Sequence, residues 1–361
     1  MHKRGMDELE KLTKLRKELE ARKLDAILIT NPINRRYLTG FTGTAGIVIV
    51  SKNAASLITD FRYIEQAAEQ AEAFTVVEHK KSIEHEIKHQ LEKLNVTNVG
   101  FEKDQLTYAK YELYHDLLDV ELVPVSGIVE QLRLIKTTDE LAVLKKAAEI
   151  ADAAFIHIQN YIKPGVKEID ISNELEFFMR KQGATSSSFD IIVASGIRSA
   201  LPHGVASAKE IQNGELVTLD YGALYEGYCS DITRTVAVGE IDNELKNIYE
   251  TVLEAQLLGV GGIKPGMSGK EADALTRDYI TEQGYGKNFG HSTGHGIGLE
   301  VHEGPSLSHR TDTALAPGMV VTVEPGIYVP DVGGCRIEDD LLITESGNER
   351  LTFAAKELIQ L

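Results

Sequence analysis

The chain has 361 residues, with 38 lysines and arginines against 55 aspartates and glutamates, and a formal net charge of −17 at pH 7. Its length exceeds that of one typical domain, and because aromatic residues make up only 6% of it, we expect a mainly aliphatic core. The acidic balance argues against nucleic acid or an anionic membrane as a partner, and no apolar run approaches membrane-spanning length.

The N-terminal segment is charged and lacks the apolar stretch of a signal peptide, so we expect a cytoplasmic protein. Met6-Asp7 resembles a natural start, which leaves open whether residues Met1–Gly5 are native. The two cysteines, Cys229 and Cys335, are expected to be small buried thiols, because a reducing cytosol disfavours a disulfide between them.

The first 130 or so residues predict a separate α/β domain. An apolar stripe follows an otherwise charged first helix at Leu9, Leu12, Leu15 and Leu19. Three strands and a helix are predicted after it, over residues 25–29, 45–50, 55–59 and 63–72. Thr137-Thr138-Asp139-Glu140 has the sequence of a capping box and predicts the start of a long helix. We therefore place the two domains at residues 1–134 and 135–361.

The second domain contains an internal repeat. Residues 162–165, Ile-Lys-Pro-Gly, recur as residues 263–266, and Gln182-Gly183 recurs as Gln283-Gly284, both at an offset of 101. Each copy encloses a segment of helix length, at residues 167–181 and 270–282, bounded by Pro-Gly and Gly. Downstream, at an offset of 104, three more positions correspond: Gly214 with Gly318, Asp220 with Glu324, and Gly222 with Gly326. We predict an α+β domain of two halves related by a pseudo-twofold axis.

Four carboxylates of this domain stand beside predicted strands. Asp220 ends the apolar run 216–219 and Asp231 precedes the β-rich run 232–238, which predicts a hairpin; Glu324 closes the run 320–323, and Glu338 precedes 341–343. Since side chains alternate between the faces of a strand, two neighbouring hairpins can direct four carboxylates to one point. Their negative charges would repel one another there unless cations lay between them.

Two divalent ions would balance the four carboxylates. An oxygen-rich site with one imidazole, His295, suits manganese and tolerates cobalt or zinc. Gly294, Gly296 and Gly298 around it are expected where backbone comes so close to metal or substrate that a Cβ has no room. Any one of these acids alone would more often be solvated or paired with arginine. The prediction of a two-metal site therefore rests on the four carboxylates and His295 together. Two such ions could activate a water and polarise a peptide carbonyl.

Five stretches resemble the pita-bread metallopeptidases and, among them, the Xaa-Pro peptidases prolidase and aminopeptidase P. They are residues 219–222, 230–235, 291–298, 323–326 and 336–339, read as LDYG, SDITRT, HSTGHGIG, VEPG and RIED. Residues 37–41, YLTGF, resemble the N-terminal domain of the same family. The resemblance implies a dinuclear-metal hydrolase whose second domain has the pita-bread fold, and it implies a homodimer.

The resemblance also implies a role for each site residue. Asp231 and Glu338 would bridge both ions, Asp220 would bind one, and His295 and Glu324 would bind the other, with Glu324 also the proton shuttle. His203 and His302 would contact the substrate carbonyl and its tetrahedral intermediate, and His291 would line the pocket. Arg336 could pair with Glu338 or receive the carboxylate of a substrate as a bidentate fork.

Prolidase is the preferred activity, because a dipeptide enzyme must meet the free carboxylate of proline and Arg336 is a cation that could do so. Aminopeptidase P, acting on longer proline-containing peptides, remains the alternative. A non-catalytic binding protein or a metal-free creatinase-like hydrolase of the same fold is less favoured, because all five ligand positions hold a competent ligand. Methionine aminopeptidase is less favoured because those enzymes often lack such an N-terminal domain.

Overall fold

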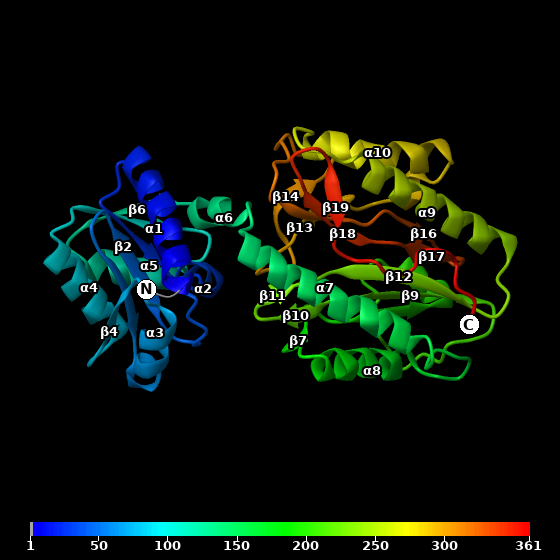
Figure 1. The fold of residues 1–361 in the computed structure, drawn as a ribbon, viewed down its shortest axis with the longest axis horizontal. Helices are drawn as coiled ribbons and strands as arrows, with labels where there is room; N and C mark the ends of the chain where they lie inside the picture. Colours follow the sequence, from blue (N-terminus) through cyan, green and yellow to red (C-terminus); the bar gives the residue numbers. More distant parts are fainter. Residues whose placement is uncertain (1–2) are drawn as a thin grey trace. The chain divides into compact units, whose positions relative to one another are not determined.

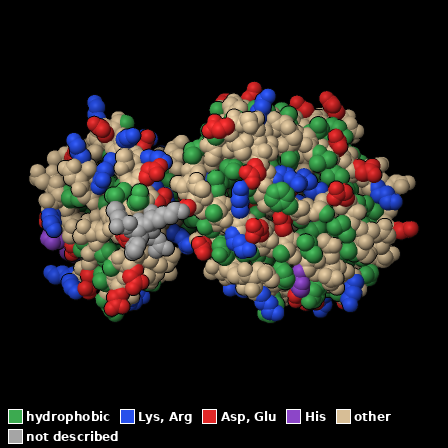
Figure 2. Space-filling view, in the orientation of Figure 1, with side chains coloured by type: hydrophobic (Ala, Val, Ile, Leu, Met, Phe, Trp, Pro, Cys, Tyr) green, Lys and Arg blue, Asp and Glu red, His purple; other side chains and the backbone are tan. Residues whose placement is uncertain are grey.

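The computed structural model describes residues 3–361 and divides the chain into two compact units, Met1–Arg133 and Leu134–Leu361 (Figure 1). Met1 and His2, the first two residues of the segment Met1–Gly5, lie outside the described residues. The first helix, α1 (Lys3–Ala21), includes Gly5 and Met6. Within residues 3–361 no helix is both long enough and apolar enough to cross a bilayer. On the face drawn in Figure 2, acidic and basic side chains are interspersed over both units.

The N-terminal unit is built on one six-stranded sheet with the order β4-β3-β2-β1-β5-β6. The sheet is mixed, because β1 pairs with β2 antiparallel and with β5 parallel. The strands are β1 (Ala26–Ile29), β2 (Ile47–Ser51), β3 (Ala55–Thr59), β4 (Thr75–Glu78), β5 (Asn98–Glu102) and β6 (Glu121–Val125). The remaining helices are α2 (Pro32–Thr39), η1 (Phe61–Tyr63), α3 (Ile64–Gln70), α4 (Ile83–Leu94), α5 (Tyr108–Leu117) and α6 (Ile128–Arg133).

One position of the predicted apolar stripe on α1 is wrong. Leu12, Leu15 and Leu19 are buried, but Leu9 is 41% exposed. The buried face continues instead through Glu8, whose Oε2 accepts a hydrogen bond of 2.7 Å from the N–H of Ala73. Spacings of four, three and four residues keep one helix face in line, whereas two successive spacings of three rotate Leu9 away from it.

The C-terminal unit begins with a half made of two helices and short sheets. Its elements are α7 (Thr138–Ile158), α8 (Glu168–Lys181), β7 (Ser186–Ser187), β8 (Ile192–Ser195), η2 (Gly196–Ala200), β9 (Glu215–Tyr221), β10 (Ala223–Tyr225), β11 (Tyr228–Cys229) and β12 (Ile232–Val238). The strands form two sheets, β11-β10-β7 and β12-β9-β8. The predicted capping box starts α7: Thr137 Oγ1 accepts from the N–H of Glu140, and Glu140 Oε2 accepts from the N–H of Thr137.

The second half repeats this plan. Its elements are α9 (Asn243–Gly262), α10 (Gly269–Glu282), η3 (Gly286–Asn288), β13 (Gly294–Gly296), β14 (Glu303–Leu307), β15 (Val320–Val323), β16 (Gly326–Val329), β17 (Gly333–Arg336), β18 (Asp339–Ile343) and β19 (Asn348–Arg350). The strands form the sheets β14-β13-β15-β18-β19 and β16-β17. Figure 1 shows α7 and α8 on one side of the strands and α9 and α10 on the other.

The backbone confirms that the two halves are related. Gly165 and Gly266, which correspond in sequence, have φ angles of 87° and 86°, a left-handed conformation that favours glycine. The N–H of Gly165 donates to Ile211 O at 2.9 Å, and that of Gly266 donates to Leu315 O at 2.8 Å. The same turn therefore precedes α8 and α10, and each helix ends within the segment that the repeat predicts.

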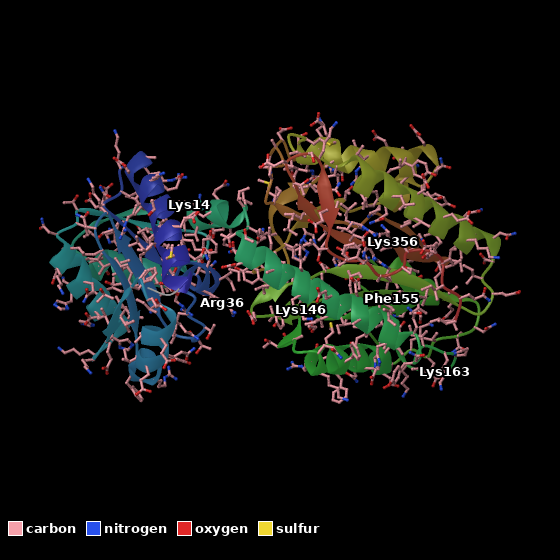
Figure 3. All side chains as sticks on the ribbon, in the orientation of Figure 1. Lys14, Arg36, Lys146, Phe155, Lys163 and Lys356 are labelled. Carbon is pink, nitrogen blue, oxygen red and sulfur yellow. The ribbon has the colours of Figure 1, made fainter. Side chains whose placement is uncertain are left out.

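The helices of each half pack on the strands of that half. In the first half, Phe155 of α7 (Figure 3) and Leu175 of α8 are buried against Leu219 of β9. In the second, Ile248 of α9 is buried in a cluster with Ile337, which directly precedes Glu338. Burying apolar side chains of this size stabilises the fold by about 1.5–3 kcal/mol each. The strand ends that carry the predicted carboxylates are therefore held by two rigid layers.

Candidate metal centre

A cavity of about 340 Å³ in the C-terminal unit contains every residue predicted for the site. Those nine residues are Asp220, Asp231, His295, Glu324, Glu338, His203, His291, His302 and Arg336. The rest of the lining, which the sequence did not single out as functional, is Phe189, Asp190, Ile192, Pro202, Val205 and Val301. The lining thus combines a cluster of polar side chains with several apolar ones, as in sites for small ligands.

Strand register explains why the four carboxylates converge. β9 and β12 pair antiparallel with Tyr221 opposite Ile232, so the residues just before each, Asp220 and Asp231, lie at the same end of the hairpin. β15 and β18 pair with Val323 opposite Asp339, so Glu324 and Glu338 lie together in the same way. The N–H of Glu338 donates to Thr233 O at 3.1 Å and joins the two hairpins. The site therefore needs a hairpin from each half.

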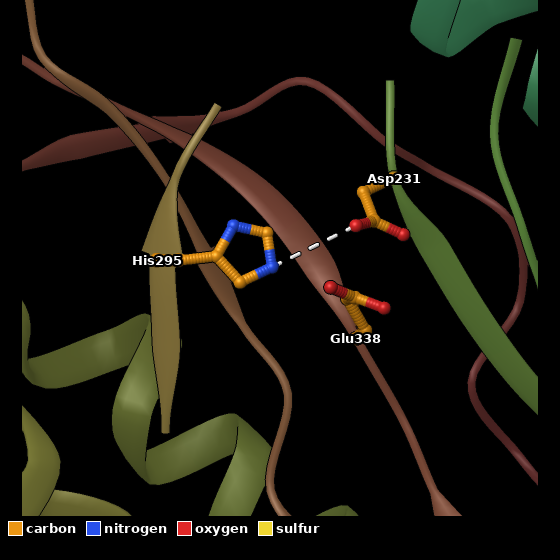
Figure 4. A group of neighbouring side chains, drawn as sticks. All are labelled: Asp231, His295 and Glu338. Atoms are coloured by element: carbon orange, nitrogen blue, oxygen red, sulfur yellow. Dashed lines mark ion pairs between the residues drawn. The ribbon is translucent and has the colours of Figure 1, made fainter. Parts of the chain in front are cut away.

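Three of the residues form a compact ligand group. Asp231, His295 and Glu338 each offer one nitrogen or oxygen, and these atoms all lie within 4.8 Å of one another (Figure 4). His295 Nε2 lies 3.8 Å from Asp231 Oδ2 and 3.3 Å from Glu324 Oε1. Asp220 lines the same cavity outside this group, with its Oδ2 paired to Arg336.

The carboxylate oxygens show how well a cation would fit. Asp220 Oδ1, Asp231 Oδ1 and Glu338 Oε1 are buried and have no hydrogen-bond partner within residues 3–361. Burial raises the pKa of Asp231 and of Glu338 well above the ordinary range, and the neighbouring carboxylates raise both further. Unpaired buried oxygens on mutually repelling acids are costly in a protein alone and are what a divalent cation would satisfy.

His295 is oriented for this purpose. Its Nδ1 lies 3.1 Å from the carbonyl oxygen of Gly296, which can only accept, so Nδ1 carries the hydrogen and Nε2 faces the carboxylates. Burial opposes ionisation of Glu324, but the hydrogen bond and charge of His295 outweigh it and lower the pKa of Glu324 to about 2. Thr322 Oγ1 also donates to Glu324 Oε1, at 3.2 Å.

Arg336 does not pair with Glu338, so that alternative for its role is wrong. It is 2% exposed and donates to four groups instead: Asp220 Oδ2, Tyr328 Oη (2.8 Å), Thr233 Oγ1 (3.1 Å) and Pro202 O (3.3 Å). Residues two apart share a strand face only inside one strand, and β17 ends at Arg336, before Glu338. The guanidinium is therefore directed at the hairpin of the first half.

The three other histidines take different places in the cavity. His291 Nδ1 donates to Ser292 O at 2.8 Å, because a carbonyl can only accept, and its Nε2 lies 2.8 Å from Tyr328 Oη. Tyr328 Oη accepts from Arg336, so its own hydrogen is available to His291. The ring of His302 lies 4.2 Å from that of His295, centroid to centroid, and His203 is exposed at the rim.

Two residues of the site were missed in the sequence. Tyr328 links His291 to Arg336, and Asp340 Oδ2 accepts from the N–H of Asp231 at 3.0 Å, while burial raises the pKa of Asp340 to about 8. Strand alternation gives no signal for either residue, because Glu324 lies outside β16, which carries Tyr328, and Glu338 lies outside β18, which carries Asp340.

The glycines around His295 lie where other parts of the chain come close to the backbone. A Cβ on Gly294 would overlap with the carbonyl oxygen of Thr322 in β15, and one on Gly296 would overlap with that of Gly304 in β14. One on Gly298 would meet the carboxylate of Glu303. These glycines make room for neighbouring strands and for a side chain. The prediction for the cysteines is confirmed: both are free and buried, and burial raises the pKa of each thiol to about 12.

Comparison with known proteins decides the family. Residues 142–345 match metallopeptidase family M24, and residues 11–135 match the creatinase/prolidase N-terminal domain. The chain belongs to metallopeptidase family M24. The predicted family, the two-part fold and the assignment as a peptidase are thereby confirmed. Membership also implies a divalent metal, for which the cavity supplies fitting ligands.

Three relatives show how far the likeness to this peptidase extends. The structure titled Xaa-Pro dipeptidase from Bacillus anthracis is 62% identical, with a TM-score of 0.97 over 98% of this chain and 100% of that one. The Xaa-Pro dipeptidase of Pyrococcus furiosus is 43% identical over 97% of this chain and 99% of its own. The structure of an X-Pro aminopeptidase from Thermotoga maritima is 40% identical, with a TM-score of 0.90 over 95% of this chain and 100% of that one.

Proposed function

We propose that this peptidase hydrolyses Xaa-Pro bonds and that Xaa-Pro dipeptides are its preferred substrates. The observation that carries the proposal is the cavity in which five ligand-competent side chains converge, in a chain 62% identical along its length to a protein named Xaa-Pro dipeptidase. The apolar walls formed by Phe189, Ile192 and Val301 suit a proline ring.

The proposed cofactor is a pair of divalent ions, Mn²⁺ before Co²⁺ or Zn²⁺, because the donors are four carboxylates and one imidazole. Asp231 and Glu338 would hold both ions, Asp220 one, and His295 with Glu324 the other. When bound, such ions supply a nucleophilic hydroxide at neutral pH and polarise the scissile carbonyl.

The protein's own groups have separate tasks in this proposal. Glu324 is ionised at neutral pH and can accept and return a proton at its carboxylate. His203 at the rim and His302 beside His295 would contact the substrate carbonyl and its tetrahedral intermediate. His291 would act as a wall and, through Tyr328, hold Arg336 in place.

A second candidate is an Xaa-Pro aminopeptidase that acts on longer peptides. The specific observation in its favour is that Arg336 already donates to Asp220, Tyr328 and other protein groups, so it is not a free cation that awaits the carboxylate of a dipeptide. The 40% identity to a protein titled X-Pro aminopeptidase points the same way.

A substrate panel tests both candidates. The purified protein is loaded with Mn²⁺ and assayed on Xaa-Pro, Xaa-Pro-Yaa and Met-Ala-Yaa peptides, with a chelated sample as the control. We expect the highest kcat/KM on Xaa-Pro, and activity that is lost with chelator and restored best by Mn²⁺ or Co²⁺. Faster cleavage of Xaa-Pro-Yaa would make the protein an aminopeptidase, and equal activity with and without chelator would refute the metal proposal.

We also propose that the enzyme is a cytoplasmic homodimer with its domains divided at residues 134 and 135. Two free buried thiols suit a reducing compartment. Light scattering after size-exclusion chromatography should give twice the chain mass of 39.7 kDa; the mass of a single chain would refute the dimer.

A further inference from the structure

Glu168, at the start of α8, binds both ends of one loop, residues 195–207. Its Oε1 accepts from the N–H and the Oγ of Ser195, each at 2.8 Å. Its Oε2 accepts from the N–H of Ser207 at 3.1 Å and from its Oγ at 2.6 Å. Arg198, inside the loop, pairs with the same Oε2. One carboxylate that is 0% exposed therefore receives five donors from three loop residues.

The middle of this loop reaches the metal cavity. Pro202, His203 and Val205 line the cavity, although His203 itself is exposed at the rim. Arg198, which pairs with Glu168, also donates to Val205 O at 2.9 Å. Glu168 is therefore linked through Arg198 to a residue that lines the cavity. The loop makes further contacts outside Glu168: Pro202 O accepts from Arg336 at 3.3 Å, Ser199 Oγ accepts from the N–H of Gly334 at 2.8 Å, and the N–H of Ala206 donates to Ile191 O at 3.4 Å. If the carboxylate contacts at its two ends were lost, the exposed tip of the loop at His203 would sample more conformations.

We propose that Glu168 is a positioning residue, which holds loop 195–207 so that His203 faces the cavity. The inference rests on the proposed role of His203 at the substrate carbonyl. Hydrogen bonds to an ionised carboxylate are roughly twice as strong as neutral ones, and several on one buried carboxylate restrict the loop more than separate surface contacts would. Glu168 is not among the residues that line the cavity, so it would act only through the loop.

The related half shows that the fold does not require this carboxylate. Glu168 corresponds in the repeat to Gly269, at the start of α10. A Cβ on Gly269 would overlap with the carbonyl oxygen of Ser306, so no acid could occupy that position. The turn before each helix is nevertheless the same. The carboxylate thus belongs to the half whose loop supplies His203, and the repeat folds without it in the other.

Glu168→Gln tests the proposal with little change in shape. The amide nitrogen of the glutamine would replace one carboxylate oxygen. It would point its own hydrogens at the loop donors that this oxygen accepted from, so the hydrogen bonds at one end of the loop would be lost. We expect kcat/KM to fall by about 10–100-fold, the range seen when groups that orient site residues are removed, with metal content unchanged. Glu174→Gln is the matched control, because Glu174 lies on the same helix and pairs with His157 at 2.6 Å, away from the loop; its activity should stay within about twofold of the unmodified protein.

A double-mutant cycle separates positioning from a general loss of structure. If Glu168 acts through the loop, Glu168→Gln should cost little further activity in a His203→Ala background. An equal loss in both backgrounds would overturn the proposal. Ser207→Ala, which removes one of the five donors, serves as a milder variant and should show a smaller loss with the same epistasis.

Hydrogen exchange provides a readout that needs no substrate. In holoprotein carrying Glu168→Gln, peptides covering residues 196–206 should exchange faster, while those of β9 and β12 remain as protected as in the unmodified protein. Unchanged exchange in that loop would overturn the proposal. Kinetics are measured on whichever peptide of the panel is cleaved fastest, so a failure of Xaa-Pro specificity would be seen separately.

Discussion

Asp231 and Glu338 are each buried with one oxygen that has no hydrogen-bond partner in the described chain, and burial, together with the charges of neighbouring carboxylates, raises the pKa of both. Such a pair is costly for the protein alone, and this cost is relieved when cations bind. Asp231→Asn or Glu338→Gln should therefore lower kcat/KM by about a thousandfold or more, equivalent to about 4 kcal/mol, while the circular dichroism spectrum stays unchanged. Activity within tenfold of the unmodified enzyme would argue against both as shared ligands.

Arg336 lies at the centre of another contact set. Lysine keeps the positive charge but cannot place donors on Asp220, Tyr328 and Thr233 at once, because its three hydrogens share one nitrogen. Arg336→Lys should lower kcat/KM about 10–100-fold on Xaa-Pro and on Xaa-Pro-Yaa alike, since the change disturbs Asp220 whichever peptide is bound. A rise in KM confined to Xaa-Pro would instead show that Arg336 receives the carboxylate of the dipeptide.

At the scale of single residues, the sequence identified the candidates for the site but not their partners. Asp220 and Asp231 could be found because both adjoin strands of one local hairpin. The partner of Arg336 could not, because Asp220 lies 116 residues away and reaches it only through the packing of two halves. Asp340 was overlooked because its contact with the N–H of Asp231, 109 residues away in the sequence, arises only when the two halves pack together.

At the scale of elements, β13 is held unusually close to its neighbours. A methyl group on Gly294 would overlap with Thr322 O of β15, and the hydrogen bond from His295 N to Thr322 Oγ1, 3.1 Å long, would be disturbed. Gly294→Ala should therefore weaken metal binding by about tenfold or more, by analogy with the loss of orienting contacts, as measured by calorimetric titration with Mn²⁺.

Gly290→Ala is the control for this change. Gly290 precedes the same strand, and a Cβ there would have no atom within 4 Å. The Gly290→Ala protein should bind Mn²⁺ with the same affinity as the unmodified protein. Equal weakening by both substitutions would mean that backbone flexibility, and not the close approach of β15, decides how His295 is placed.

Elements that are bounded by proline and glycine, or that are rich in apolar residues, were predicted from the sequence, and other elements were not. α8 and α10 follow a Pro-Gly turn and end at glycine, and the strands β1, β2 and β3 are short runs rich in apolar residues. β4 and β6 were missed because they are edge strands whose side chains are mostly part-exposed. Between them in sequence, α5 buries only Tyr114 and shows little apolar periodicity. Such segments take their structure from the sheet they complete.

At the scale of the whole catalytic unit, the site depends on the packing of two related halves. One half contributes Asp220 and Asp231 and the other contributes His295, Glu324 and Glu338, and each set alone is an acidic strand end of the kind common at protein surfaces. The repeat thus has a chemical consequence: it brings two acidic hairpins together, and the resulting charge must be balanced by a cation or by protonation of the carboxylates.

This charge predicts how stability depends on pH. Burial raises the pKa of Asp340 from its ordinary 3.8 to about 8, and Asp220, Asp231 and Glu338 shift in the same direction. Between the ordinary and the raised pKa the folded protein holds protons that the unfolded chain has released, so the free energy of unfolding falls as pH rises. The lowered pKa of Glu324, about 2, acts only below its ordinary value of 4.5. Metal-free protein should therefore lose stability from about pH 4 to pH 8.

Divalent cations should oppose this loss, because they favour the ionised carboxylates and bind the folded state alone. At a thousandfold excess over the dissociation constant the gain is about 4 kcal/mol. Because protons compete with the metal, the rise in Tm on adding Mn²⁺ should be several degrees larger at pH 8 than at pH 5. Differential scanning calorimetry with Mn²⁺ and with chelator at both pH values measures it. In Asp231→Asn protein the gain should shrink at pH 8; an equal gain at both pH values in the unmodified enzyme would show that these carboxylates are not the ligands.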